Sequence, residues 1–481
     1  MSEHDLSRLV MSLILGGIYI WVIYDSAYGT ASARHLTRGR FDPLIDPLYL
    51  PCVLAGVVIF WFVLGWNDYR SILPLCTGLV IQTGLYYVVL LPLLPLLRRL
   101  LRPGTVAALW LLPNFLFFSL YSYMWPSRPK AVLSIPAAFS RWFLAVWAAG
   151  FLLVLGRAIV QHLTYRRELL RVASPVTDPA VLDIWQQEMA AVGWETVKMT
   201  PLYSPAAVTP LSIGLWRKST RVVLPEQNYT PEELRLIFRH ELIHARRRDS
   251  NEKLFLTLCQ AVLWFYPLMW IAMRKCADDL ELSCDELALI DADANTRETY
   301  ARLILRTAGD ERGFTSCLSV QAKALRYRLQ GIVTPRKKLV GGVLSGLLIA
   351  ALLLTNGLIA VAYAPASGEE VIFSNQSADY SPTSIALRNR DEYFFSPLTC
   401  TDIPAFKRYL AGLTLCHITG MYDPRGDCLL VTMDNSLSVT LYEHLVTVEE
   451  QDGHQQQKSS LYYSPEPLDL DYLMTLLEEK T

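Results

Sequence analysis

The residues His240-Glu241-Leu242-Ile243-His244 combine two metal-binding imidazoles with a carboxylate between them. Residues four apart lie on the same face of a helix, so His240 and His244 can bind a single metal ion. Zinc suits two neutral imidazoles, and Glu241 is then close enough to act as general base toward a water molecule. The motif therefore predicts a Zn²⁺ centre in which His240 and His244 are ligands and Glu241 is catalytic.

Two features of the surrounding sequence support this prediction. The segment Thr230-Pro231-Glu232-Glu233 has a hydroxyl, a proline and a glutamate in the order of a helical capping box. The chain has only eight histidines, and His240 and His244 are the only two between residues 163 and 399. A random scatter of histidines would rarely place them four residues apart on a predicted helix.

We expect the third zinc ligand to be Glu281. It opens the segment Glu281-Leu282-Ser283-Cys284-Asp285-Glu286, which has the pattern of a helix. Catalytic zinc commonly takes two histidines and one glutamate and keeps a fourth position for water. Glu286, Asp278 and Asp279 compete for the same role. Cys284 is soft enough to bind zinc, but we expect it off the face that carries Glu281, in the protein core.

Two aspartates are candidates to orient the histidine ligands. Asp249 follows His244 by five residues, and Asp285 lies four residues after Glu281 on the same helical face. A carboxylate that accepts the outward N–H of a ligating imidazole fixes its tautomer and its direction. We therefore expect Asp249 and Asp285 to contact the imidazoles from behind.

The elements that position these residues include membrane-spanning helices. Hydrophobic residues make up 52% of the 481 residues. Several stretches reach the roughly 20 residues needed to cross a hydrocarbon core of about 30 Å. The predicted spans lie near residues 8–25, 49–66, 71–97, 105–125, 142–160 and 339–363.

Basic residues predict the orientation of these spans, because arginine and lysine favour the cytoplasmic side. Clusters of them follow the first, third and fifth spans and precede the sixth. An outside N-terminus satisfies all four clusters. We therefore divide the chain into four parts: a membrane domain of about five helices, a cytoplasmic zinc peptidase domain, a last transmembrane helix and an extracytoplasmic sensor domain. Their predicted bounds are 1–162, 163–338, 339–363 and 364–481.

One more apolar stretch, residues 254–273, is long enough to look like a span. A full crossing would put Glu281 on the opposite side of the membrane from His240, and Pro267 interrupts the helical pattern. We expect a buried or membrane-hugging helical hairpin that links the two halves of the zinc site.

Short runs separated by proline and glycine predict a small antiparallel sheet before the zinc-binding helix, at 195–202, 207–214 and 221–224. Metallopeptidases commonly hold an extended substrate on such an edge. The outer part is predicted as a small α+β domain, with helices at 403–413 and 468–479 and strands at 428–433, 438–448 and 459–464. Cys400, Cys416 and Cys428 are candidates for one disulfide in an oxidising compartment.

Residues 165–338 resemble the peptidase domain of the BlaR/MecR-type membrane metallopeptidases, the antibiotic-sensing signal transducers of bacteria. The resemblance is carried by six segments, in order: Thr209–Leu215, Val222–Glu226, His240–His244 with Arg248-Asp249, Trp264–Leu268, Glu281–Glu286 and Ala324–Leu329. It implies a mainly α, gluzincin-like zinc domain in the bacterial cell membrane, with His240, His244 and Glu281 as ligands and Glu241 as catalytic residue. The β-lactam-binding version needs a serine three residues before a lysine in the outer domain. Lys407, Lys458 and Lys480 lack that serine, so β-lactam sensing is not carried over.

The sequence therefore predicts a zinc endopeptidase in the lipid bilayer that transduces an extracytoplasmic signal. The resemblance implies a cytoplasmic protein substrate such as a transcriptional repressor, and the chain itself, at 309–316, is a second candidate. A constitutive processing protease and a non-catalytic signalling scaffold remain the alternatives. The net charge of −1 and the motifs give no sign of direct nucleic-acid binding. The external ligand and the oligomeric state, a homodimer among the options, stay open.

Overall fold

The computed structural model describes most of the chain. The described residues are 3–28, 47–53, 55–56, 69–120, 124–134, 137–216, 218–290, 292–307, 316–317, 322–333, 338–373, 382–388, 396–418, 422, 424, 427–433, 437–451 and 457–479.

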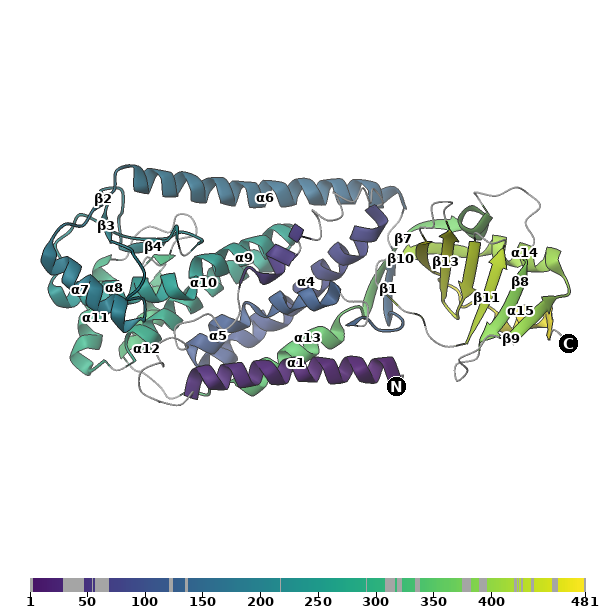
Figure 1. The fold of residues 1–481 in the computed structure, drawn as a ribbon, viewed down its shortest axis with the longest axis horizontal. Helices are drawn as coiled ribbons and strands as arrows, with labels where there is room; N and C mark the ends of the chain where they lie inside the picture. Colours follow the sequence, from purple (N-terminus) through teal and green to yellow (C-terminus); the bar gives the residue numbers. More distant parts are fainter. Residues whose placement is uncertain are drawn as a thin grey trace.

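Three long apolar helices within these residues have the length and composition of membrane spans (Figure 1). They are α1 (Glu3–Tyr28), α4 (Tyr69–Leu100) and α6 (Ala137–Arg171). Their apolar windows cover His4–Tyr24, Gly78–Leu100 and Ala145–Arg171. A multi-pass membrane protein is therefore supported, in agreement with three of the predicted spans.

Two other predicted spans are shorter or more irregular than expected. The region 105–125 divides into α5 (Pro103–Leu109) and a 3-10 segment, η1 (Leu112–Leu120), which contains Pro113. The last span shortens to α13 (Gly342–Thr355), because Ile359 already begins the strand β7 (Ile359–Ser367). The predicted span 49–66 lies largely outside the described residues.

The short helix α13 packs closely along α1. A Cβ atom added at Gly346 would lie 2.6 Å from the backbone oxygen of Gly16, so the two backbones touch. At one end of this pair the buried Arg8 donates to the backbone oxygens of Met124 at 2.9 Å and Asn356 at 3.0 Å. The N-terminal end of α1 is thereby fixed to the start of the C-terminal region.

The residues around the predicted zinc site form helices and a five-stranded sheet. The sheet has the order β2-β3-β5-β4-β6. Its strands are β2 (Ser174–Pro175), β3 (Leu202–Tyr203), β4 (Leu211–Ile213), β5 (Arg221–Leu224) and β6 (Ser316–Cys317). The predicted antiparallel sheet is wrong in one respect, since β3 and β5 run parallel. Most of 195–202 is also not a strand, and only Leu202 joins β3.

Helices surround this sheet at the end of the molecule opposite to the C-terminus (Figure 1). They are α7 (Pro179–Ala191), α8 (Pro231–Arg247), α9 (Asp249–Val262), α10 (Pro267–Ala288), α11 (Ala294–Thr307) and α12 (Ala322–Val333). Apolar side chains of α7, α8 and α11 form a buried cluster with those of β5.

The predicted helical hairpin at 254–273 is confirmed. Helix α9 ends at Val262 and α10 begins at Pro267, so the proline takes the first turn of the second helix instead of breaking it. The hairpin tip contacts the long helix α6, where Trp147 Nε1 donates to the oxygen of Val262 at 2.9 Å. Apolar residues of both hairpin helices join the same core as α4, α5 and α13.

The C-terminal region is built on a ten-stranded mixed sheet of order β1-β7-β10-β14-β13-β12-β11-β8-β9-β15. Strand β1 (Ala131–Ser134) precedes α6 in sequence and pairs parallel to β7. The remaining strands are β8 (Ser384–Arg388), β9 (Ser396–Cys400), β10 (Thr414–Ile418), β11 (Cys428–Met433), β12 (Leu437–Leu441), β13 (Leu445–Gln451), β14 (Gln457–Tyr463) and β15 (Leu477–Glu479). Helices α14 (Ile403–Gly412) and α15 (Leu470–Thr475) accompany them.

Three expectations about this region need correction. The predicted strand 438–448 is two strands, β12 and β13, that pair as a hairpin. The predicted helix 468–479 stops at Thr475, and its last part is β15. Cys400, Cys416 and Cys428 are free thiols rather than members of a disulfide.

Candidate metal centre

The histidine motif lies on α8, whose start is fixed by the predicted capping box. Thr230 Oγ1 accepts from the Glu233 backbone N–H at 3.3 Å, and Glu233 Oε2 accepts from the Thr230 N–H at 2.8 Å. The helix ends at Arg248, the one described non-glycine residue with positive φ, at 61°. This left-handed residue starts α9 at once and turns Asp249 back toward α8.

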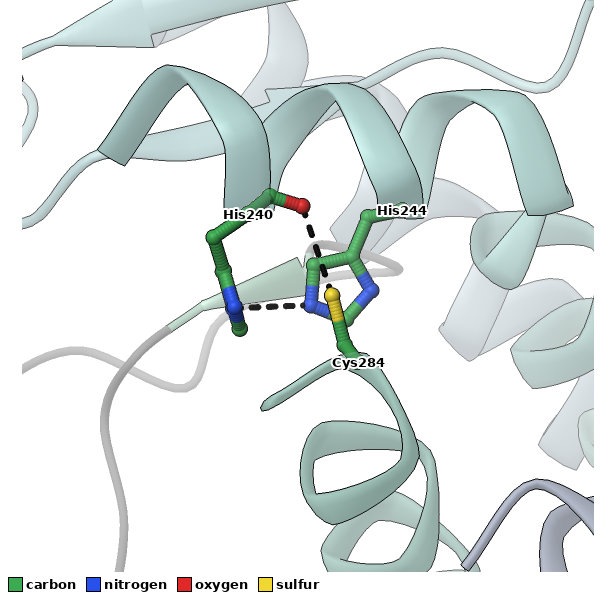
Figure 2. A group of neighbouring side chains, drawn as sticks. All are labelled: His240, His244 and Cys284. Carbon is green, nitrogen blue, oxygen red and sulfur yellow. Dashed lines mark hydrogen bonds between the residues drawn. The ribbon is translucent and has the colours of Figure 1, made fainter. Parts of the chain in front are cut away.

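The two imidazoles face each other across a fully buried space (Figure 2). Their Nε2 atoms are 3.0 Å apart. The Nδ1 atom of His244 lies 2.6 Å from Asp249 Oδ2, and Nδ1 of His240 lies 2.7 Å from the hydroxyl of Tyr300. Because both Nδ1 atoms have acceptors, both Nε2 atoms are directed at the same point, where a proton or a metal ion can lie between them.

Glu281 reaches this point from α10. Its Oε2 lies 3.5 Å from His240 Nε2 and its Oε1 lies 3.7 Å from His244 Nε2. Arg328 of α12, itself fully buried, holds the carboxylate through Nη1 at 3.1 Å from Oε2. Lys253 Nζ lies 4.0 Å from the other oxygen, Oε1, so the carboxylate faces two cationic side chains as well as the imidazoles.

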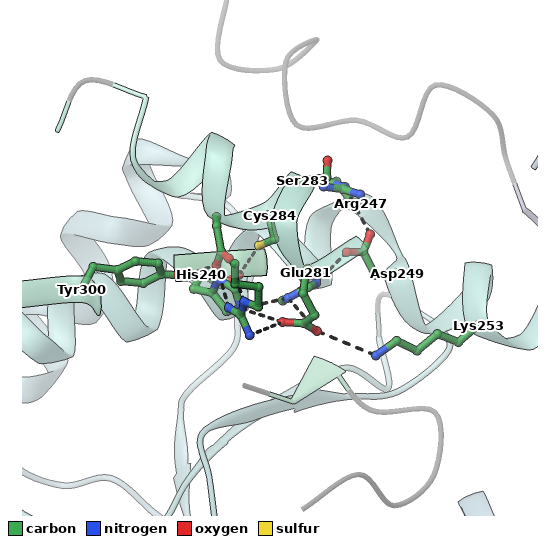
Figure 3. A network of polar contacts seen from close by, with 11 residues as sticks. His240, Arg247, Asp249, Lys253, Glu281, Ser283, Cys284 and Tyr300 are labelled. Atoms are coloured by element: carbon green, nitrogen blue, oxygen red, sulfur yellow. Dashed lines mark hydrogen bonds and ion pairs between the residues drawn. The ribbon is translucent and has the colours of Figure 1, made fainter. Parts of the chain in front are cut away.

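The two predicted orienting aspartates differ in how they act, and Asp249 lies beside Arg247 (Figure 3). Asp249 contacts His244 directly, and Arg247 Nε fixes its other oxygen at 3.2 Å. Asp285 is 3.5 Å from His240 Nδ1 and reaches it through Tyr300, whose hydroxyl donates to Asp285 Oδ1 at 2.7 Å.

Sequence reasoning missed Tyr300 and Arg328. Arg328 binds Asp285 through two nitrogens, with Nε 2.7 Å from Oδ2 and Nη2 2.7 Å from Oδ1. Arg328 belongs to the quoted segment Ala324–Leu329, which was the available signal, but nothing in the segment showed its partner. Tyr300 carried no signal in the sequence.

Cys284 is closer to the site than predicted. Its sulfur and the ring nitrogens of His240 and His244 all lie within 4.8 Å of one another. The prediction that it would point away from the face of Glu281 is wrong, because residues three apart on a helix are also neighbours. The prediction that it is buried is confirmed.

Glu241 lies beside the sheet, on the same buried part of α8. Burial raises the pKa of its carboxyl above the ordinary value, although the imidazoles of His240 and His244 act in the opposite direction. Both of its oxygens lack hydrogen-bond partners among the described residues. A buried carboxylate of raised pKa, free to accept a proton, has the properties of a general base.

The electrostatics of the centre favour a cation. Burial lowers the pKa of His240, but the neighbouring Cys284 and Glu281 outweigh this and raise the pKa to about 9. Burial raises the pKa of Glu281, yet His244 and Arg328 hold it well below the usual carboxyl range. The facing lone pairs and the ionised carboxylate fit a metal ion bound by nitrogen and oxygen, as zinc is.

Comparison with known proteins agrees with this geometry. Residues 131–332 match the family described as BlaR1 peptidase M56. The match covers less than half of the chain, and we call these residues the M56 region. The buried pair His240 and His244 of this M56 region is consistent with the metal site of a peptidase.

Two relatives are regulatory proteins. The chain is 24% identical over 188 residues to "Regulatory protein BlaR1" of Bacillus licheniformis, which is 39% of this chain and 31% of that protein. It is 26% identical over 96 residues to "Regulatory protein BlaR1" of Staphylococcus aureus, which is 19% of this chain and 16% of that protein. The similarity thus spans less than a third of either relative.

The acidic residues that competed with Glu281 lie elsewhere in the M56 region. Asp279 binds Arg98 Nε of α4 at 2.8 Å and Trp110 Nε1 at 2.9 Å. The Glu286 carboxylate is near the backbone of Gly104 in α5. Asp279 and Glu286 therefore hold α10 against α4 and the α5 region, and they do not face the imidazoles.

Proposed function

We propose that this protein is a membrane-bound zinc metalloendopeptidase in which His240, His244 and Glu281 hold the metal and Glu241 is the general base. One observation carries the proposal. The Nε2 atoms of His240 and His244 face each other at 3.0 Å, and a buried carboxylate stands within 3.7 Å of both. Two imidazole nitrogens and one carboxylate directed at a single buried point are the donor set of a catalytic zinc site.

Each residue has a distinct task in peptide hydrolysis. When bound, zinc polarises the scissile carbonyl and lowers the pKa of a water molecule. Glu241 takes a proton from the attacking water and returns it to the leaving amine. Asp249 and Tyr300 hold the imidazoles in the tautomer that presents Nε2, and Arg328 fixes the Glu281 carboxylate.

Strand β4, which lies between β5 and β6, is the strand that would present a peptide to Glu241. Ser212 of β4 is close enough to the Glu241 carboxylate to lower its pKa. The other edge of β4 pairs antiparallel with β6, where Leu211 is opposite Cys317 and Ser212 opposite Ser316. A segment of the chain thus takes the position of an added substrate strand. This supports self-cleavage near β6, although 309–315 lie outside the described residues.

The broader role that we propose is signal transduction. The C-terminal region would lie outside the cell and sense a ligand, and the zinc domain would lie in the cytoplasm and cleave a protein such as a transcriptional repressor. Both relatives are named as regulatory proteins, which supports this role. So does the pairing of β1 with β7, which joins the segment before α6 to the sheet of the C-terminal region.

Purified Glu241→Gln protein provides the test. The base is removed but the metal donors remain, so zinc content should equal that of the wild type. Cleavage of a peptide library should fall by roughly 10²–10⁴-fold, the usual contribution of a positioned general base. Retained hydrolysis with bound zinc would reject the assignment of Glu241.

A further inference from the structure

The buried thiol of Cys284 makes a contact that the proposed peptidase chemistry does not use. Its Sγ lies 3.4 Å from the backbone oxygen of His240 and within 4.8 Å of the histidine ring nitrogens (Figure 2). The side chain is completely excluded from solvent. A thiol is a weak hydrogen-bond donor, so this contact to a carbonyl holds the sulfur only loosely.

The number of protein donors determines whether a zinc site is open to water or closed. A catalytic zinc site has three protein donors and one open position, whereas four protein donors make a closed site. His240, His244 and Glu281 already supply three donors. A fourth soft donor, within 4.8 Å of both imidazoles, exceeds the number for an open site.

We propose that Cys284 is a fourth zinc ligand in the resting protein and closes the position that water and substrate require. This inference rests on the proposed function, since it concerns the same metal. On binding, the S–H bond breaks, a sulfur–zinc bond forms and one proton leaves to solvent. Activation reverses the exchange: water replaces the sulfur and the thiolate takes up a proton.

Cys284 lies on α10, and the same helix contacts membrane helix α4, so a movement within the membrane would also move the sulfur. Asp279, five residues earlier on the same helix, is buried and binds Arg98 and Trp110 of the membrane helices. Glu281 is additionally held by Arg328, whereas the sulfur contacts the His240 carbonyl and lies near the two imidazoles. A small rotation of α10 moves both Glu281 and Cys284, and the ion pair with Arg328 would keep the carboxylate at the metal while the sulfur is released.

X-ray absorption at the zinc edge of the full-length protein in detergent tests the proposal. Wild-type protein should show a sulfur neighbour at about 2.3 Å, the usual zinc–sulfur distance. Cys284→Ser should lose this neighbour while it keeps the nitrogen and oxygen neighbours. Cys276→Ser is the matched control, because Cys276 is buried on the same helix, and it should keep the sulfur neighbour.

Cobalt substitution gives a second readout that does not depend on activity. Wild-type and Cys276→Ser proteins should show a thiolate-to-cobalt charge-transfer band that Cys284→Ser lacks. Bound zinc without any sulfur neighbour, with the same cobalt spectrum in all three proteins, would overturn this inference and leave the peptidase proposal intact. Wild-type protein that binds no metal at all would overturn both.

Discussion

At the scale of single residues, the imidazole orientation depends on groups behind the rings. His244 has a direct carboxylate partner, whereas His240 is held by a relay in which Tyr300 accepts from the ring and donates to Asp285. Arg328 binds Asp285 through two charge-assisted contacts of 2.7 Å. The tautomer of His240 is therefore set by three side chains from three helices.

Removal of the Tyr300 hydroxyl should weaken the metal site without emptying it. Tyr300→Phe leaves Nδ1 of His240 without a partner, and loss of such a partner typically costs 10–100-fold in metal affinity. Chelator competition would measure this fall. Tyr229→Phe is the control, because the Tyr229 hydroxyl makes only a 3.4 Å contact to Gln227. Equal zinc affinity in the two variants would show that the relay does not hold His240.

The histidine motif could be predicted because its determinants are local. The spacing of His240 and His244 and the capping box at Thr230 lie within fifteen or so residues of chain, and the structure has the expected helix. Tyr300 and Arg328 reach the site through tertiary packing of α11 and α12, which no local pattern encodes. Cys284 was placed wrongly because Glu281 and Asp285 define only the centre of a helical face, and neighbouring positions share its edge.

At the scale of elements, α10 connects the metal centre to the membrane. Its N-terminal half shares a core with α4 and α5, and its C-terminal half carries Glu281 and Cys284. The buried pair of Arg98 and Asp279, 2.8 Å apart, lies between the two halves. A displacement of this contact would also move Glu281 and Cys284, which follow it on α10.

Loss of the Arg98 charge should destabilise this junction strongly. Arg98→Gln leaves the buried Asp279 carboxylate with the Trp110 hydrogen bond but without its ion-pair partner, a loss that commonly costs about 3–5 kcal/mol. The melting temperature in detergent should fall well below that of the control Arg99→Gln. The double variant Arg98→Gln/Asp279→Asn should recover part of the loss. Identical melting of Arg98→Gln and Arg99→Gln would contradict the role of the pair.

The contact between α1 and α13 depends on glycine. A Cβ at position 346 would lie 2.6 Å from the Gly16 oxygen, so Gly346→Ala must push the helices apart. Overpacking of this kind costs about 1–3 kcal/mol. A lower melting temperature of Gly346→Ala than of Val343→Ala, a change at a half-exposed position of the same helix, is the expected result. Equal values would mean that close packing of these helices is unimportant.

The irregular membrane elements were harder to predict than α8. Composition alone extends a span across 105–125 and 339–363, but tertiary contacts end them early. Pro113 lies in a 3-10 segment, and the residues after Asn356 are recruited into β7 by pairing with β1 and β10. Strand pairing between residues 131 and 359 has no signature in either segment by itself.

At the scale of the whole molecule, the metal centre and the C-terminal sheet lie at opposite ends, with the apolar helices between them (Figure 1). The long helix α6 runs from the strand β1 beside the sheet to the start of the M56 elements. Its Trp147 contacts the tip of the α9–α10 hairpin on the way. Helix α6 and this contact thus connect the sheet with the hairpin whose second helix carries Glu281.

The two ends should be accessible from opposite sides of the membrane. Leu133 of β1 and Trp216 after β4 are both exposed, at 55% and 63%. In intact cells, a membrane-impermeant maleimide should label Leu133→Cys above the background of the unchanged chain. Trp216→Cys should be labelled only after the cells are opened. Labelling of both variants in intact cells would contradict the proposed topology.

A single zinc ion shared by α8 and α10 is central to the proposed function, and the zinc content of purified full-length protein tests this most directly. Wild-type protein should carry a single zinc ion per chain, and His244→Ala should carry almost none. Glu281→Ala should lose most of its zinc, because the third donor comes from the second helix. Wild-type protein without zinc, or His244→Ala protein with as much zinc as the wild type, would contradict the metal centre.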